Sequence, residues 1–404
     1  MLACREQLQS ASRRVTAAGG NFDSRSTSAN VLLPEDQFHH IFGFLDVVDV
    51  IAVSAVCWQL NGWCRLCQTL DVTQDVGAVS LAKLLRLHPD VTDVTVRSAP
   101  RLSAAGYAAI AAVAPQLSRL RLLNARAVAD APLAAFARRN LSALTVLELS
   151  GTFFTRGPAM LRVVCAAPNL TALSLDGFRH LRDEDVSAVV AALPQLESLS
   201  VADCTALARL RVAAPALTAL TVARCVHARA LLLETPALTA LDASTCTKLS
   251  ADAVDGAVAA CPALRRLVLR GCAGLAALRI ASAELRELDL SCCGALASVA
   301  LDCPRLARLS LDMCMALRSA TLALRTIHTL DLSLLPVEAL SIDAPELRAL
   351  NLRSSYRLHD AGIRCCAPSL QLVDHCGTHI TAGVFGGGAR SVAHNGMLLQ
   401  WMSN

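Results

Sequence analysis

Apolar residues recur along this chain in one repeated phrase. Between residues 196 and 314 the pattern L-x-x-L-x-[L/V/A]-x-x-C occurs six times, beginning at Leu196, Leu217, Leu238, Leu264, Leu285 and Leu306. Less strict copies begin at Val91, Leu117, Leu144, Leu170, Ile327, Leu347 and Leu370. Within each copy apolar and polar residues alternate, which predicts a short strand with its leucines on one buried face.

The interval between copies predicts what connects one strand to the next. The copies begin 20 to 27 residues apart. In three long copies Ser103, Asp183 and Ser250 precede Ala- and Val-rich segments, which predicts helices with a Ser or Asp N-cap. The 21-residue copies leave no room for a helix. There the alternation at 207–212 and 275–280 predicts short extended segments on the outer face.

One copy buries too few side chains to offset the conformational entropy lost on ordering it, so the copies must stack on one another. The phrase resembles the leucine-rich-repeat (LRR) signature in its cysteine-containing form. We therefore expect an α/β solenoid, a horseshoe with a parallel concave sheet. The fourth-position leucines should be buried in a single run of parallel strands, as at Leu199, Leu220, Leu267 and Leu288.

Residues before the repeats have a different character. Residues 1–30 are rich in Ser, Thr, Arg, Gly and Asn, and are expected to form a disordered tail. The segment 31–67 predicts three short helices, of which the first begins near Pro34 and has one apolar stripe formed by Phe38, Ile41, Phe42 and Leu45. So small a helical module needs a partner, or else it is a cap on the first repeat.

The residues of this segment resemble an F-box, the motif that joins a receptor to the small Skp-family adaptor of a cullin–RING ubiquitin ligase. The resemblance covers residues 31–67 and departs from the motif at Leu60, where a tryptophan is usual; Trp58 and Trp63 flank that place. It implies that the adaptor contact or its support is formed by Leu33, Pro34, Ile41, Phe42, Leu45, Val56 and Cys57. Residues 67–72 predict the first strand of the repeats.

Composition narrows the class of protein. The chain has 404 residues, a net charge of only +4 and 3% aromatic residues, which argues against a nucleic-acid surface. We find no apolar run of 18 residues, so a soluble, cytoplasmic and/or nuclear protein is expected, although the arginines of the first 30 residues leave a mitochondrial transit peptide open. Six of the 17 cysteines occupy one repeat position, where reduced, buried thiols are expected.

The sequence contains one cluster of potential zinc ligands, formed by Cys365, Cys366, His375, Cys376 and His379. Their spacing matches no familiar zinc motif, and Cys366 precedes Pro368 much as Cys261 precedes Pro262. Displaced repeat cysteines are therefore the favoured interpretation. We find no Gly-rich phosphate loop, nucleophile elbow or His-Glu metal helix, and we expect no catalytic residue, metal or cofactor.

Polar positions between the core leucines point out of the expected concave sheet. The fifth and seventh positions of the C-terminal copies carry Asp242, Arg270, Asp289, Asp312, Asp331, Arg353 and Asp374. One interpretation is the solvated face of a soluble solenoid. The other is a net acidic, target-binding platform that prefers a protein segment carrying Lys or Arg.

Together these patterns resemble an F-box protein of the cysteine-containing LRR class. We expect a tail at 1–30, an F-box at 31–67, a solenoid at 68–380 and a C-terminal cap or tail at 381–404. The resemblance implies a non-enzymatic substrate-recognition subunit of an SCF-type ubiquitin ligase. It would bind the Skp-family adaptor, through it the cullin and RING subunits, and a protein target. A non-ligase LRR scaffold or inhibitor, and an enzyme using metal at the Cys/His cluster, are the alternatives.

Overall fold

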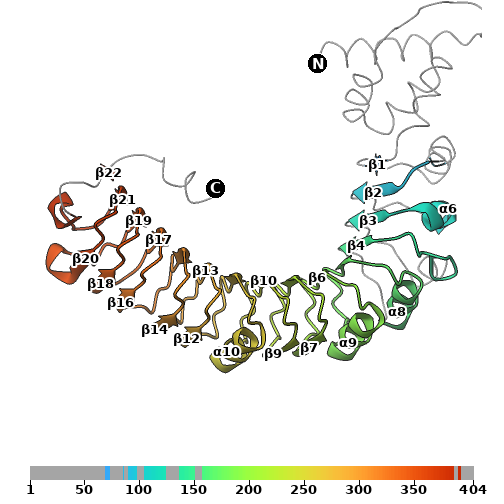
Figure 1. Ribbon diagram of the computed structural model, residues 1–404, viewed down its shortest axis with the longest axis horizontal. Helices are drawn as coiled ribbons and strands as arrows, with labels where there is room; N and C mark the ends of the chain where they lie inside the picture. Colours follow the sequence, from blue (N-terminus) through green and yellow to red (C-terminus); the bar gives the residue numbers. More distant parts are fainter. Residues whose placement is uncertain are drawn as a thin grey trace, which may run out of the picture. The chain divides into compact units, whose positions relative to one another are not determined.

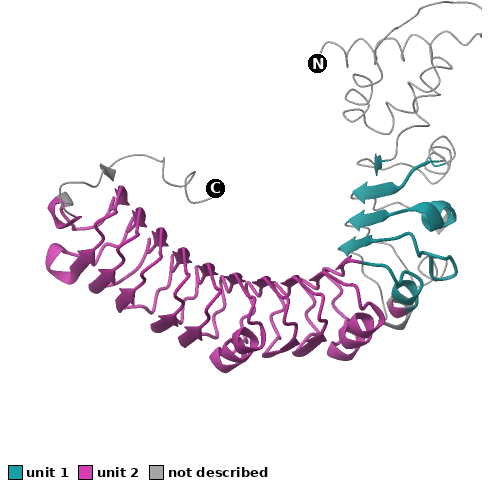
Figure 2. Ribbon diagram, viewed as in Figure 1, with its two compact units in different colours: residues 1–155, 162–170 teal, residues 156–161, 171–404 magenta. Residues whose placement is uncertain are grey.

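The computed structural model describes residues 69–72, 85, 90–97, 104–123, 136–150, 157–385 and 390–392. The chain forms two compact units. Unit 1 comprises residues 1–155 and 162–170, and unit 2 comprises residues 156–161 and 171–404 (Figure 2). The expected tail (1–30) and the F-box segment (31–67) lie outside the described residues, so they stay predictions.

Unit 1 contains four strands that pair in parallel in chain order: β1 (Thr69–Val72), β2 (Asp93–Arg97), β3 (Arg119–Leu123) and β4 (Val146–Ser150). Strand β1 confirms the strand predicted at 67–72. Helix α6 (Ala104–Val113) and the short η1 (Ala114–Gln116) connect β2 to β3, and α8 (Gly157–Cys165) follows β4. The long copies thus return through helices, as their length predicts.

Unit 2 contains one parallel sheet made of the first strand of each copy. Its strands follow chain order: β5 (Ala172–Ser174), β6 (Ser198–Ser200), β8 (Ala219–Thr221), β10 (Ala240–Asp242), β11 (Arg266–Val268), β13 (Glu287–Asp289), β15 (Arg308–Ser310), β17 (Thr329–Asp331), β19 (Ala349–Asn351), β21 (Leu372–Asp374) and β22 (Arg390–Val392). Figure 2 shows unit 2 as an arc with this sheet on its inner side. The predicted concave sheet is therefore present within unit 2.

On the outer side of unit 2, α9 and α10 lie on either side of one small sheet, and two further small sheets follow α10 (Figure 1). Helix α9 (Asp183–Ala192) contacts β7 (Arg209–Ala213), and α10 (Ala251–Ala260) contacts both β9 (Ala230–Glu234) and β12 (Ala277–Ala281). The outer strands pair in parallel: β7 with β9, β12 with β14 (Ser298–Asp302), and β18 (Ala339–Asp343) with both β16 (Ser319–Ala323) and β20 (Ile363–Cys366). The extended segments predicted at 207–212 and 275–280 are thus confirmed.

Leucines from every copy fill the space between the inner sheet and the outer layer. The fourth-position residues Leu199, Leu220, Leu267 and Leu288 are buried and lie in β6, β8, β11 and β13 of the one parallel sheet. The strand residues on either side of these leucines are half-buried or, at Arg266, exposed, which matches the predicted alternation. The core is therefore continuous through the stacked copies of unit 2, and no copy encloses a core of its own.

The predicted helix N-caps differ between α9 and α10. Ser250 caps α10, because its hydroxyl accepts a hydrogen bond from the Ala253 N–H (3.2 Å). Asp183, predicted as the cap of α9, instead accepts hydrogen bonds from the N–H groups of Ala208 (3.1 Å) and Arg209 (2.9 Å) in the next copy. It is Asp185 that binds the Arg182 N–H at the start of α9 (3.0 Å). The sequence does not distinguish these roles, since both carboxylates lie in the first turn.

The C-terminal end of the described chain adds to the sheet. Strand β22 pairs in parallel with β21, and the short helix η3 (Ala382–Phe385) precedes it. Residues 386–389 and 393–404 are outside the described residues, so the expected boundary of the C-terminal segment stays a prediction. Within the described ranges no helix has the length and apolar character to span a membrane.

Candidate functional site

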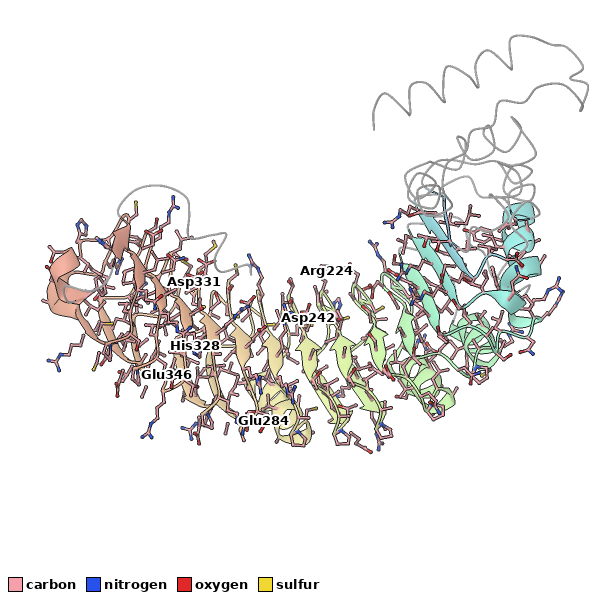
Figure 3. All side chains as sticks on the ribbon, turned by 45° about the horizontal axis from the view of Figure 1, so that its top comes forward. Arg224, Asp242, Glu284, His328, Asp331 and Glu346 are labelled. Carbon is pink, nitrogen blue, oxygen red and sulfur yellow. The ribbon has the colours of Figure 1, made fainter. Side chains whose placement is uncertain are left out.

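The candidate site is the exposed inner sheet of unit 2, where the predicted target-binding residues follow the strand ends. Asp242, Asp289, Asp331 and Asp374 are each the last residue of a strand, in β10, β13, β17 and β21. Figure 3 shows Asp331 and His328 at opposite ends of β17. Asp289 and Asp331 are two strands apart, which places them about 10 Å from each other.

These aspartates also hold the turn that follows each strand. The Oδ1 atom of each accepts a hydrogen bond from the backbone N–H two residues later: Ser244 for Asp242 (2.9 Å), Ser291 for Asp289 (2.9 Å), Ser333 for Asp331 (3.0 Å) and Cys376 for Asp374 (3.0 Å). Asn351 makes the same bond to the Arg353 N–H (3.1 Å). An amide oxygen therefore serves the turn as well as a carboxylate oxygen does, and the turn itself does not require the negative charge.

The seven predicted residues are not equally available to a partner. Arg270 and Arg353 are exposed, whereas Asp242, Asp289, Asp312 and Asp331 are half-buried, and Asp374 is only 7% exposed. Asp374 is thus mainly a structural residue of its turn. The other aspartates keep their second carboxylate oxygen available, because no described hydrogen bond or ion pair uses it.

Three of these aspartates influence one another. The Ser333 Oγ atom lies 3.0 Å from Asp312 Oδ1 and 2.7 Å from Asp331 Oδ1, and its single hydrogen can serve only one of them at a time. Burial raises the pKa of Asp331 above its ordinary value, and the charges of Asp312 and Asp289 raise it further, against the lowering effect of the bonds from Ser333. The strand ends therefore carry concentrated negative charge.

Basic residues at the opposite ends of the strands were not singled out from the sequence. The second position of the phrase is basic directly before β11, β13, β17 and β19, where it is occupied by Arg265, Arg286, His328 and Arg348. At the third position Glu287 lies between Arg266 (3.6 Å) and Arg308 (3.8 Å). The sheet is therefore net basic where its strands begin, despite Glu287, and net acidic where they end, despite Arg270 and Arg353. Comparing the second positions of the copies reveals this row in the sequence.

The six cysteines of the phrase are buried and reduced, as predicted, but they are also hydrogen-bond donors. Each thiol donates to a backbone carbonyl of the preceding copy at 3.1–3.2 Å, from Cys204, Cys225, Cys246, Cys272, Cys293 and Cys314. Burial raises the pKa of Cys225 to about 12 and that of Cys293 to about 11. These thiols therefore stay protonated and unreactive at neutral pH.

The C-terminal Cys/His residues are spread over different elements. Cys365 and Cys366 end the outer strand β20, whereas His375 and Cys376 follow the inner strand β21. The His379 ring stacks on His359 with centroids 4.9 Å apart. Among the residues that the structure describes, no group of three or more His, Cys, Asp and Glu side chains is placed to hold a metal ion.

The predicted adaptor-binding residues are outside the described part of the chain. Leu33, Pro34, Ile41, Phe42, Leu45, Val56 and Cys57 all fall between residues 31 and 67. Their role is therefore a prediction that only binding experiments can test.

A family model described as FBD-associated F-box protein At5g56370, LRR repeats, matches residues 110–251 and 236–349, which together exceed half of the chain. No curated protein matches. Similar solved structures include the Rad7 and Elc1 complex in yeast, with 12% identity, a TM-score of 0.42 and coverage of 97% of this chain and 95% of that chain. YopM from Yersinia enterocolitica WA-314 has 19% identity, a TM-score of 0.40 and coverage of 78% and 70%.

The functional domain of InlJ from Listeria monocytogenes, which includes a cysteine ladder, has 14% identity, a TM-score of 0.38 and coverage of 82% of this chain and 74% of that chain. The family match coincides with the copies whose strands, turns and cysteines are described above. The chain therefore belongs to the leucine-rich-repeat family of the FBD-associated F-box proteins.

Proposed function

We propose that this protein is the substrate-recognition subunit of an SCF-type, cullin–RING ubiquitin ligase. In this proposal residues 31–67 bind the Skp-family adaptor, and through it the cullin and RING subunits, while the inner sheet of unit 2 binds a target protein. Membership of an F-box-associated repeat family carries the proposal. The F-box-like residues Leu33, Pro34, Ile41 and Phe42 support it independently.

The chain's own contribution is proximity, and ubiquitin transfer is performed by the other subunits. Two features of the described residues support this role. The polar face of the inner sheet is formed by strand ends and turns, which suit binding, and the phrase cysteines are buried and protonated, so they do not serve as nucleophiles. We propose a cytoplasmic and/or nuclear location, where such a ligase and its targets would meet.

The exposed sheet suits a protein target better than a nucleic acid. Its strand ends carry Asp242, Asp289, Asp312 and Asp331, which repel phosphate groups. A target segment bearing Lys or Arg is favoured by the same charges, which raise the association rate and the specificity more than the affinity. The basic strand starts would orient such a segment by repelling its cationic side chains.

Adaptor binding is the test of this proposal. Full-length chain co-expressed with a Skp-family adaptor is expected to co-purify with it, whereas a variant with Leu33→Ala and Pro34→Ala loses the adaptor. A variant with Asp289→Asn and Asp331→Asn serves as the matched control and keeps it, because Asn351 shows that an amide holds the same turn. A folded wild-type chain that never holds the adaptor would identify a non-ligase scaffold or inhibitor instead.

A further inference from the structure

Each turn that follows an inner strand from β5 to β21 contains one residue with a left-handed backbone. The positive φ values lie between 57° and 82° and belong to Gly177, Asp203, Arg224, Thr245, Gly271, Cys292, Met313, Leu334, Ser354 and Gly377. This conformation suits glycine and is tolerated by Asn and Asp, and it costs free energy for a residue with a bulky side chain. Gly or Asn at this position therefore gives the most stable folded chain.

Met313 and Leu334 depart from this preference in two ways. Both are bulky apolar residues with φ of 57°, and both are exposed, at 42% and 43%. Neither the backbone conformation nor the exposure stabilises the isolated chain. Five other non-glycine residues share this backbone conformation, so what distinguishes Met313 and Leu334 is a bulky apolar side chain held in it and exposed to solvent.

Met313 and Leu334 occupy the same position in adjacent turns, after the paired strands β15 and β17. Consecutive turns are joined by hydrogen bonds from the Cys292 N–H to the Asp312 carbonyl (2.7 Å) and from the Met313 N–H to the Ser333 carbonyl (3.2 Å). The Cys292 Sγ atom lies 3.9 Å from Met313 Sδ, so neighbouring side chains at this position are in contact. Successive turns are thus about one strand spacing, roughly 5 Å, apart.

Met315 (49% exposed) and Tyr356 (53% exposed) lie two residues after the left-handed position in their own turns. We call Met313, Met315, Leu334 and Tyr356 the turn patch. It contains four of the five large apolar residues that are exposed in the described part of the chain; the fifth, Leu232, lies on the outer strand β9. The four residues lie in three successive turns, and apolar residues close to one another mark an interaction surface more often than scattered ones do. On the Tyr356 side, Arg357 lies over the ring (5.9 Å to its centroid) and pairs with Glu338 (2.8 Å).

Negative charge lies directly beside the turn patch. Asp312 precedes Met313, and Asp331 precedes Leu334 by three residues in the same turn. Neither forms an ion pair with any described Arg or His side chain. Elsewhere on the turns and the sheet acidic side chains do have cationic partners: Asp203 with Arg224 (2.7 Å) and Glu287 with Arg266 (3.6 Å). The charge beside the patch is available to a cation from a partner.

We propose that the turn patch, with Asp312 and Asp331, binds an extended segment of a partner protein in which an aliphatic or aromatic side chain lies near Lys or Arg. The apolar side chain contacts Met313 and Leu334, and the cation contacts the two carboxylates. The identification of this partner as a ligase target rests on the proposed function. The binding of the segment to the turn patch is independent of that function.

The full-length chain is tested by fluorescence anisotropy against labelled 12-residue peptides that place Leu two to four residues from Arg. Two matched sets replace Leu by Ser, or Arg by Glu. The Leu–Arg peptides are expected to bind at least about tenfold more tightly than either set, and salt should weaken them because screening acts on the charged contact. Equal binding of the three sets would overturn the proposal.

Variants at the left-handed position separate binding from folding. Met313→Asn combined with Leu334→Asn suits the backbone, so thermal stability is expected to be unchanged or raised while the tenfold preference is lost. Asp312→Asn combined with Asp331→Asn should abolish the advantage of Arg over Glu. Thr245→Asn, at the same position in an earlier turn, and Leu232→Thr on β9 are controls that bind as wild type does.

Other occupants of the patch give different results, and each would overturn the proposal. A second copy of the chain would make wild type dimeric in analytical ultracentrifugation and the Met313→Asn, Leu334→Asn variant monomeric, with no peptide preferred. Peptide binding seen only after removal of residues 393–404 would assign the patch to the chain's own C-terminal segment. Adaptor co-purification with the same variants distinguishes the ligase proposal from the turn-patch proposal. Peptide binding without adaptor binding would contradict the ligase role alone.

Discussion

At the residue scale, the phrase cysteine combines two properties that a single larger hydrophobe lacks. It is small enough to be fully buried between copies, and its thiol donates to a carbonyl of the preceding copy, as from Cys246 to Val222 (3.1 Å). Ser355 occupies the corresponding place in a later copy and donates to the Leu332 carbonyl (2.9 Å). A hydroxyl can therefore replace the thiol at this position.

This comparison predicts unequal costs for two substitutions at Cys246. Cys246→Ala removes the donor and leaves a small void, and should lower the free energy of unfolding by about 1–2 kcal/mol. Cys246→Ser keeps the donor and should cost less. Urea unfolding followed by circular dichroism measures both, and a serine variant less stable than the alanine variant would show that the hydrogen bond is unimportant.

A second prediction concerns Asp331 and pH. Burial raises its pKa above the ordinary value of 3.8, so the folded state binds the proton more tightly than the unfolded state. Ionised Asp331 therefore opposes folding above its folded pKa, and this opposition is absent below the unfolded pKa. Asp331→Asn should raise the free energy of unfolding at pH 7 and give no gain at about pH 3.

Asp360 supplies the control of opposite sign. Its pKa is lowered, chiefly because its carboxylate accepts hydrogen bonds from the Thr381 N–H (2.7 Å) and hydroxyl (2.8 Å). Its contribution to stability is present above the unfolded pKa and is lost as the pH falls through the folded pKa. Asp360→Asn should therefore lower stability at pH 7 and converge with wild type in acid. Identical pH profiles for the two variants would contradict both assignments.

At the element scale, the outer layer is held by a backbone approach that demands glycine. Gly362 is the last residue of the short helix η2 (Asp360–Gly362), directly before β20, and an added Cβ there would clash with the Glu338 carbonyl oxygen just before β18. Any side chain here pushes β20 away from β18. We expect Gly362→Ala to lower the free energy of unfolding by about 1–3 kcal/mol, measured by urea unfolding.

Gly256 offers the contrasting substitution. It lies inside helix α10, and an added Cβ would meet no atom within 4 Å. Gly256→Ala is therefore expected to stabilise the protein by about 0.5–1 kcal/mol, because alanine restricts the unfolded chain and favours the helix. The melting temperature of Gly256→Ala should be higher than that of wild type, and the melting temperature of Gly362→Ala should be lower. Shifts in the same direction would contradict the roles assigned to these two glycines.

The inner strands were predictable from the sequence because each depends on a local alternation, as in Leu196, Leu199 and Val201. The outer strands at 209–213 and 277–281 were predictable as extended segments for the same reason. Their pairing into small sheets was not, since it depends on whether a helix such as α10 separates two copies. The role of Asp183 depends likewise on the position of Arg209 in the next copy.

The candidate site was predictable only in part. The sequence places Asp289 and Asp331 on one row, which the structure confirms, but it does not show that their Oδ1 atoms hold the turns. The left-handed backbone at Met313 and Leu334 was also hidden, because most other copies carry other non-glycine residues there. The N–H groups of Met313 and Leu334 bond to carbonyls of the next copy, at Ser333 (3.2 Å) and Arg353 (2.8 Å), and the pattern within a single copy does not reveal such contacts.

At the scale of the whole molecule, two binding functions belong to separate parts of the chain in the proposed role. Residues 31–67 are proposed to hold the adaptor, and the strand ends and turns of unit 2 are proposed to hold the target. The copies stabilise one another through a shared core, so the target surface requires the intact stack. Substitutions on one surface should leave the other surface functional.

The most direct test is proximity labelling in cells, with and without proteasome inhibition, using full-length wild type and two variants. Wild type should label a Skp-family adaptor together with proteins that accumulate on inhibition. Leu33→Ala with Pro34→Ala should lose the adaptor and keep those proteins, whereas Met313→Asn with Leu334→Asn should keep the adaptor and lose them. Adaptor labelling that is absent from wild type, or the loss of one identical set by both variants, would contradict the central claim.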